Sequence, residues 1–378
     1  LGHIGQAYYI TQWFPKPAVY DRYGWHPMPY LSQGEFYSEF GSFDVNITLP
    51  ENYVVGGTGE QQSAGERAWM DSLAQLPVPP REVTITGKQK DPFPASSARM
   101  KTIRFTQDKV HDFAWIADKR FIVRKGEAVL EQSQRHVTTW ALFTPKNATA
   151  WEDGVNYVSE ALLHYSKWVG DYPYSACTAV DGTIAAGGGM QYPMIPRIRD
   201  NAAKMASDEV IAHEVRHNWF FGILGSNERD HPWMDEGVNS FCELRYMNER
   251  YPGHKSVIAE GIPTFVFGGE TIGHRRLSEL AFLLNARRNL DQPPGLGSQV
   301  FSPLNYGTAM YLKTALALDQ LFAFLGPERF DACMHAYYDA WHHKHPYPQD
   351  MKKVFEDVSG RDLDWCFDAL IDGDEKID

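Results

Sequence analysis

The chain has 378 residues, of which 43% are hydrophobic and 22% are charged. This length and composition allow a large core and predict more than one domain. The formal net charge of −12, with no basic stripe to offset it, argues against nucleic acid as a partner. No apolar run approaches the length of a membrane-spanning helix, so the sequence predicts no integral membrane segment.

The first part of the chain has the pattern of β-strands. Apolar and polar residues alternate over residues 43–49, 82–86 and 100–105, which is typical of half-buried strands. From about Ala150 the period changes, and residues 151–169 have the pattern of an amphipathic helix. The change predicts an α+β protein with a boundary near residue 136, so that a β-rich domain over residues 1–135 precedes a mainly helical domain over residues 136–378.

Three glycines stand directly before Met190 and Gln191. A run over residues 187–189 suits an edge strand that another backbone approaches closely. Such an edge can hold an extended peptide by adding it as a further strand. A plain flexible turn is the alternative interpretation.

The most informative pattern is the H-E-x-x-H of residues 213–217, followed after eighteen intervening residues by Glu236. On a helix, His213 and His217 lie one above the other and can offer two imidazole nitrogens to one metal ion. Two histidines and one carboxylate, with a fourth position for water, are typical of catalytic zinc. Glu214 is then placed to take a proton from that water. An ordinary half-buried histidine pair is the alternative.

The helix that carries the motif has readable ends. Ser207 or Asp208 is expected to cap its start, because a short side-chain oxygen can accept from the free N–H groups of the first turn. Gly222 and Gly225 make it plausible that the helix ends near residues 222–225. A second, short helix is expected over residues 233–240, and its glutamate would point back at the first helix.

With these residues the chain resembles peptidase family M1, the gluzincin aminopeptidases. The family pattern places H-E-x-x-H eighteen residues before the glutamate of W-x-x-E-G, which Trp233, Glu236 and Gly237 match. A Tyr-x-Lys that opens a helix, with Leu-Gly about fifteen residues on, is matched by residues 311–313 and 325–326. The similarity extends from about residue 12 to residue 365 and is strongest to bacterial envelope members.

The resemblance implies a saddle-like N-terminal β-domain over residues 1–135 and a thermolysin-like catalytic domain over residues 136–378. It implies one Zn²⁺ per chain, peptide substrates and removal of N-terminal amino acids, with Glu214 as general base. Tyr311 would donate to the oxyanion, and Tyr306 is the alternative because the loop can be aligned either way. A periplasmic or secreted location is implied, with the cytoplasm as the alternative. Relative to the family, the start of the N-terminal domain and the C-terminal helical domain are expected to be missing.

One position departs from the family. The family's Gly-x-Met-Glu-Asn strand, which holds the substrate, corresponds to Gly188, Gly189, Met190, Gln191 and Tyr192. The family's glutamate pairs with the substrate's α-amino group, whereas the amide of Gln191 supplies no charge. The substitution could be engineered, could be a natural shift in specificity, or could reflect a misplaced strand. Two further functions therefore stay open: a zinc hydrolase that needs no free N-terminus, and a non-catalytic scaffold.

Two further carboxylates and the cysteines complete the set of candidates. Asp235 or Glu243 could accept the other N–H of a ligand histidine, although each could instead be a solvated or structural carboxylate. No C-x-x-C occurs, so a cysteine zinc site is not expected. The four cysteines could all be buried thiols, or two of them could form one disulfide: Cys177, Cys242, Cys333 and Cys366.

Overall fold

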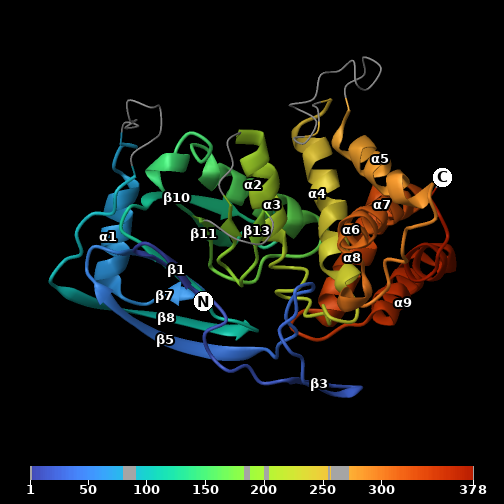
Figure 1. Ribbon diagram of the computed structural model, residues 1–378, viewed down its shortest axis with the longest axis horizontal. Helices are drawn as coiled ribbons and strands as arrows, with labels where there is room; N and C mark the ends of the chain where they lie inside the picture. The colour runs from blue at the N-terminus through green and yellow to red at the C-terminus, as the bar shows by residue number, and fades with distance from the viewer. Residues whose placement is uncertain are drawn as a thin grey trace. The chain divides into compact units, whose positions relative to one another are not determined.

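The computed structural model describes residues 2–79, 91–182, 188–199, 204–253, 256 and 272–377. The expected strand over residues 82–86 and Gly187 lie outside these residues. The chain forms two compact units. The first unit comprises Leu1–Pro17, Phe40–Lys167 and Asp171–Asn218, and the second comprises Ala18–Glu39, Trp168–Gly170 and Trp219–Asp378. Sheets and helices both occur, and the expected α+β class is confirmed (Figure 1).

The first unit contains two antiparallel sheets, and one of them holds the strands that the sequence predicted over residues 43–49 and 100–105. Strand β5 (Gly41–Pro50) pairs with β8 (Met100–Val110), and β8 pairs with β7 (Glu60–Gln61). The apolar residues of β5 and β8 meet on one face, because Ile47 lies opposite Ile103 in the register. The other sheet has the order β1-β2-β9-β6, formed by Gly2–Ile4, Ala7–Ile10, Trp115–Asp118 and Val54–Gly57.

A five-stranded mixed sheet carries the rest of the first unit. Its order is β10-β11-β12-β14-β13, formed by Ile122–Val129, His136–Phe143, Ala176–Asp181, Arg197–Ile198 and Gly189–Met190. Strands β10 and β11 form an antiparallel hairpin across residues 135 and 136, where the sequence predicted a domain boundary. That boundary stays a prediction. The predicted helix over residues 151–169 is α2 (Gly154–Trp168).

One row of side chains crosses the whole five-stranded sheet on one face. The register places Met190 opposite Arg197, Arg197 beside Val180, Val180 beside Leu142, and Leu142 opposite Val123. Helix α1 (Ala64–Ala74) covers part of this face. The hydrophobic core between this face of the sheet and α1 is formed by the following buried residues: Val54, Met70, Ala114, Ile116, Phe121, Val123, Leu142, Val180, Tyr192 and Ile195. The row fixes which side chains point to which face of the sheet.

The second unit is mainly helical, and Figure 1 shows its helices gathered in the yellow-to-red part of the chain. The α-helices are α4 (Glu236–Arg250), α5 (His274–Ala286), α6 (Pro303–Asn305), α7 (Thr314–Leu325), α8 (Pro327–Trp341) and α9 (Pro348–Ser359). Within the described part of this unit, η6 (Tyr306–Lys313) and η7 (Trp365–Asp372) are π-helical. Among the described helices, none is long and apolar enough to cross a membrane.

A segment from the N-terminal part of the chain belongs to the second unit. Residues 18–39, which we call the strap, contain the hairpin of β3 (Val19–Asp21) and β4 (Gly24–His26). Asp21 accepts hydrogen bonds from the hydroxyl groups of Tyr37 at 2.8 Å and Tyr347 at 2.6 Å. Arg22 forms an ion pair with Asp350 at the start of α9. These contacts attach the strap to the helices of the second unit.

Candidate active site

Helix α3 (Lys204–Arg216) carries the first part of the motif. The expected start of this helix is wrong, since the chain is already helical at Lys204 and both Ser207 and Asp208 are fully buried within the helix. The expected end near residues 222–225 is also wrong. The Asn218 backbone N–H and side-chain amide both donate to the carbonyl group of Val215, at 3.1 and 2.7 Å, and this closes the helix after Arg216.

The two histidines of the motif lie together at this helix end. The ring centroids of His213 and His217 are 4.9 Å apart, with an angle of 76° between the ring planes. His217 is only 2% exposed, whereas His213 is half-buried. Two imidazoles one helical turn apart, one of them accessible, are the donor arrangement expected for a metal ion bound from one side.

Glu214 packs directly against the candidate substrate strand. A Cβ atom at Gly189 would lie 2.2 Å from Glu214 Oε1 and 2.3 Å from Glu214 Cδ, so only glycine leaves room for this carboxylate. A Cβ atom at Gly188 would meet only the methyl groups of Val210, at 3.8 Å. Glu214 itself is buried, at 5% exposure. The structure therefore brings Glu214 and the glycine strand together within the first unit.

The expected edge strand is confirmed for its described residues. Strand β13 (Gly189–Met190) is the last strand of the five-stranded sheet and pairs with β14 alone among the described strands. Gln191 follows it and is buried, at 5% exposure. The side-chain nitrogen Nε2 of Gln191 has no hydrogen-bond partner among the described residues. An edge with an unused amide donor beside it can receive a polar ligand.

Glu236 lies in the second unit, at the first residue of α4. The expected short helix over residues 233–240 is wrong in both bounds. Trp233 and Met234 form a separate 3₁₀ turn, η2 (Pro232–Met234), and α4 continues to Arg250. The helix is longer because Phe241 packs against Phe330, so tertiary burial continues beyond the predicted end. Glu236 is 5% exposed.

Tyr306 and Tyr311 both lie in the π-helical segment η6 of the second unit. A π-helix bonds each residue to the fifth along, so residues five apart come one above the other. The two ring centroids are 5.8 Å apart. The Tyr311 hydroxyl group forms a hydrogen bond with Glu236, whereas the Tyr306 hydroxyl group accepts from the backbone N–H of Gly34 at 3.0 Å. Tyr311 therefore contacts the candidate ligand, and Tyr306 holds the strap.

Both phenols are kept protonated by their surroundings. Burial raises the pKa of Tyr311 well above its ordinary value, and the negative charge of Glu236 raises it further. Burial, followed by the charges of Glu236 and Glu228, raises the pKa of Tyr306 in the same way. At neutral pH each group is thus a hydrogen-bond donor and carries no charge.

Sequence reasoning missed a buried carboxyl group beside these residues. Glu228 is fully buried, and burial raises its pKa well above the ordinary range, with Asp235 and Glu236 as further causes. Neither carboxylate oxygen of Glu228 has a hydrogen-bond partner among the described residues, so no donor offsets the cost of its burial. Nothing in the spacing of Glu228 marks it, since only the fold brings it to Asp235.

The remaining candidates have defined surroundings. Glu243 forms an ion pair with His274 at 2.9 Å within the second unit. A role for Glu243 or Asp235 beside a ligand histidine stays a prediction. All four cysteines are free and buried, which confirms the interpretation as buried thiols. Burial raises the pKa of Cys177 and of Cys366 to about 12, so these thiols stay protonated.

Residues 194–370 match the family model for the Peptidase family M1 domain. Among curated proteins, the chain is 24% identical over 155 residues to the aminopeptidase A of Gloydius brevicauda, covering 40% of this chain and 15% of that protein. It is 25% identical over 163 residues to the glutamyl aminopeptidase of Bitis rhinoceros, covering 42% of this chain and 16% of that protein. The chain thus spans only a small part of these relatives.

Two solved structures have a similar fold. Legionella pneumophila aminopeptidase A, in complex with aspartic acid, matches 93% of this chain and 36% of its own, with a TM-score of 0.63 and 13% identity. The M1 zinc metallopeptidase from Deinococcus radiodurans matches 89% of this chain and 65% of its own, with a TM-score of 0.57 and 14% identity. At this identity the likeness concerns the fold.

Proposed function

We propose that the chain is a zinc aminopeptidase that removes N-terminal residues from peptides, because residues 194–370 match the family model for the Peptidase family M1 domain. The observation that carries the proposal is the close packing of Glu214 on Gly189, which puts the candidate general base against the candidate substrate strand. Peptides are the proposed substrates. A bacterial envelope location stays a prediction.

The residues fit a zinc ion by the chemistry of their donors. His213 and His217 offer two imidazoles from successive positions at one helix end, and Glu236 offers a buried carboxylate at the start of another helix. Zinc in catalytic sites takes this combination of two histidines and one carboxylate. We propose that these three residues hold one zinc ion per chain. When bound, zinc lowers the pKa of a water ligand and polarises a carbonyl group.

Side chains and backbone groups of the protein then transfer the proton, stabilise the oxyanion and align the substrate. Glu214 accepts a proton from the attacking water and delivers it to the leaving amine. Tyr311, whose phenol is protonated at neutral pH, donates to the oxygen that becomes negative in the transition state. The edge strand β13 supplies backbone groups that align an extended peptide.

Gln191 favours a second candidate function. A neutral amide can accept a hydrogen bond from an ammonium group but adds no opposite charge, so discrimination for a free N-terminus depends on other residues. The alternative is a zinc hydrolase that also cleaves blocked peptides.

The test is hydrolysis of a leucyl chromogenic amide, beside its N-acetylated counterpart, by zinc-loaded protein and by Glu214→Gln. We expect activity on the free amine alone, and a loss of about 100-fold or more in Glu214→Gln. Equal activity on both substrates would show that a free N-terminus is not required, and would support the broader zinc hydrolase in place of the aminopeptidase. Zinc binding without turnover of either substrate would leave a scaffold and overturn both enzymatic functions.

A further inference from the structure

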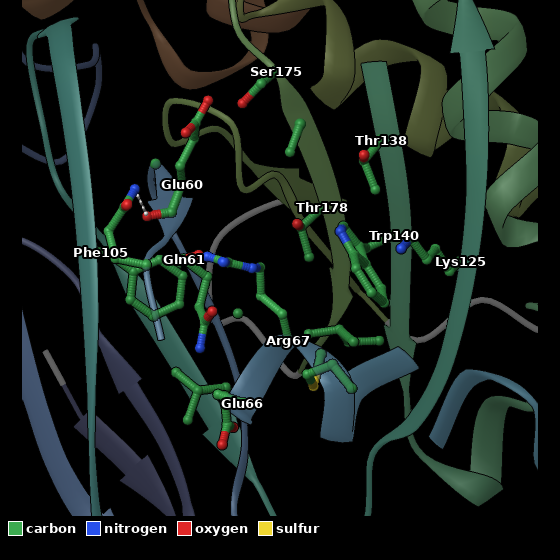
Figure 2. Close-up of a pocket in the computed structure, with 18 of the residues that line it drawn as sticks. Glu60, Gln61, Glu66, Arg67, Phe105, Lys125, Thr138, Trp140, Ser175 and Thr178 are labelled. Carbon is green, nitrogen blue, oxygen red and sulfur yellow. Dashed lines mark hydrogen bonds between the residues drawn. The ribbon is translucent and has the colours of Figure 1, made fainter. Parts of the chain in front are cut away.

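A cavity lies in the first unit, between the five-stranded sheet and α1. Its volume is about 650 Å³, within the range of small-molecule sites. Strands β6 and β7 form one wall, helix α1 forms another, and β10, β11 and β12 form the floor. Figure 2 shows Thr138, Trp140 and Thr178 on the sheet side and Arg67 extending toward Gln61 on the other.

The floor follows from the strand register. Lys125 lies opposite Trp140, and Trp140 lies beside Thr178, so these three side chains form a row across β10, β11 and β12. The next row contains Thr138 beside Ala176. Thr138 and Thr178 both line the cavity. The floor thus offers an aromatic ring and two hydroxyl groups.

Most charges around the cavity are already paired. Lys125 forms an ion pair with Asp71 at 2.7 Å, and Glu66 forms one with Lys101 at 2.6 Å. Two lining residues of opposite charge stay outside these pairs: Glu60 on β7 and Arg67 on α1. Within the described ranges neither has an ion-pair partner. The guanidinium group of Arg67 donates to the backbone carbonyl of Gln61, which holds it at the cavity wall.

Gln61 adds an unused amide between these two charged residues. It follows Glu60 in β7 and lines the same cavity. Neither Oε1 nor Nε2 of Gln61 has a hydrogen-bond partner among the described residues, although both atoms are shielded from solvent. A shielded amide without partners costs free energy, so the Gln61 side chain would gain by turning toward a ligand in the cavity that offers both a donor and an acceptor.

We propose that this cavity binds a small zwitterion of the amino-acid type. Its ammonium group would lie toward Glu60, its carboxylate toward Arg67, and the amide of Gln61 would bond to either end. Such a ligand neutralises both unpaired charges at once, which a neutral or singly charged ligand cannot do. Leu142, Met70 and Phe105 also line the cavity, so an apolar side chain fits better than a charged one.

The cavity is separate from the residues of the proposed reaction. Met190 packs against the core that covers the cavity side of the sheet, in the same row as Leu142. Neighbouring residues of a strand point to opposite faces, and Gly189 faces Glu214. Glu214 and the cavity therefore lie on opposite faces of one sheet, and the inference does not depend on the proposed function.

The test is calorimetric titration of zinc-loaded protein with L-leucine and with two analogues that each lack one charge, L-leucinamide and N-acetyl-L-leucine. The same titrations are made on Glu60→Gln and Arg67→Gln. We expect the wild type to bind L-leucine at least about tenfold more tightly than either analogue, and each variant to lose about tenfold in affinity for L-leucine. Arg99→Gln is the matched control, because the Arg99 side chain is 82% exposed and lies outside the cavity lining.

Titration of His213→Ala distinguishes the cavity from the proposed zinc site. Affinity that is unchanged in His213→Ala and in Arg99→Gln, and reduced in Glu60→Gln and Arg67→Gln, supports the cavity. Binding that disappears in His213→Ala and survives Arg67→Gln would place the amino acid among the zinc ligands and overturn the proposal. Failure of the wild type to bind L-leucine would overturn it as well. None of these outcomes depends on turnover, so they do not report on the proposed peptidase activity.

Discussion

A Cβ atom on Gly189 would lie 2.2 Å from Glu214 Oε1, which is closer than any two such atoms approach. The backbone of Gly189 is not in the left-handed region, so the requirement for glycine at this position comes from space and not from conformation. One missing side chain on an edge strand thus makes room for one carboxylate on a helix.

We expect Gly189→Ala to lower kcat by about 100-fold, because the added methyl group must displace the Glu214 carboxylate by the order of an ångström. Zinc content, measured by atomic absorption, should stay at the wild-type level. Gly188→Ala is the matched control, since its Cβ atom would meet only Val210 methyl groups at ordinary contact distance. Equal losses in the two variants would show that the contact with Glu214 is not the cause.

We expect Tyr311→Phe and Tyr306→Phe to differ. Tyr311 contacts Glu236 and should donate in the transition state, so its loss should reduce kcat by about 100-fold or more with little change in KM. Tyr306 accepts from Gly34, and its loss should chiefly cost about 1 kcal/mol of stability. Steady-state kinetics and urea unfolding separate the two effects. A larger loss of kcat in Tyr306→Phe would reverse the roles.

We expect Gln191→Glu to increase discrimination for a free N-terminus. A carboxylate in place of the amide would form a charge-assisted bond with the substrate ammonium, which should raise the ratio of kcat/KM for the leucyl amide to that for its N-acetylated form by about tenfold. The variant should be less stable without substrate, because Gln191 is buried. An unchanged ratio would indicate that this side chain does not contact the substrate amine.

Asp21 should make the attachment of the strap sensitive to acid. Burial alone would raise its pKa, but hydrogen bonds from Tyr347, the Tyr23 backbone, His26 and Tyr37 outweigh it and lower the pKa to about 2. Because the folded pKa lies below the ordinary value of 3.8, the ionised group stabilises the fold above that pH, and this contribution is lost as the pH falls from 3.8 toward 2.

The corresponding variant is Asp21→Asn. By linkage, the lowered pKa of Asp21 corresponds to about 2 kcal/mol of unfolding free energy. The difference in unfolding free energy between wild type and Asp21→Asn should therefore be largest at pH 7 and should become smaller below about pH 4. Urea unfolding at a series of pH values measures it. A difference that does not change with pH would assign the effect of the substitution to packing.

Metal removal should abolish activity without unfolding the chain. The core of the second unit is formed by aromatic contacts such as those of Phe241 with Phe330 and of Phe355 with Phe367, which do not involve the proposed ligands. We expect a chelator to remove activity, Zn²⁺ to restore it, and circular dichroism to change little. Loss of the helical signal on chelation would mean that the metal is structural.

The sequence by itself determined the features that depend on the spacing of neighbouring residues along the chain. The alternation of apolar residues predicted β5 and β8, since every second side chain of a strand reaches one face. The spacing of His213 and His217 predicted that their rings lie close together, and three successive glycines predicted an edge strand. These signals are local, so no knowledge of distant contacts is needed to use them.

The tertiary structure alone decided the features that depend on distant packing. Burial made Ser207 and Asp208 interior helix residues instead of caps, and the π-helix brought Tyr306 and Tyr311 together. The fold also attached residues 18–39 to the second unit and buried Glu228 beside Asp235. The physical reason is that burial and long-range hydrogen bonds outweigh local helix and capping preferences, and neither can be read from neighbouring residues.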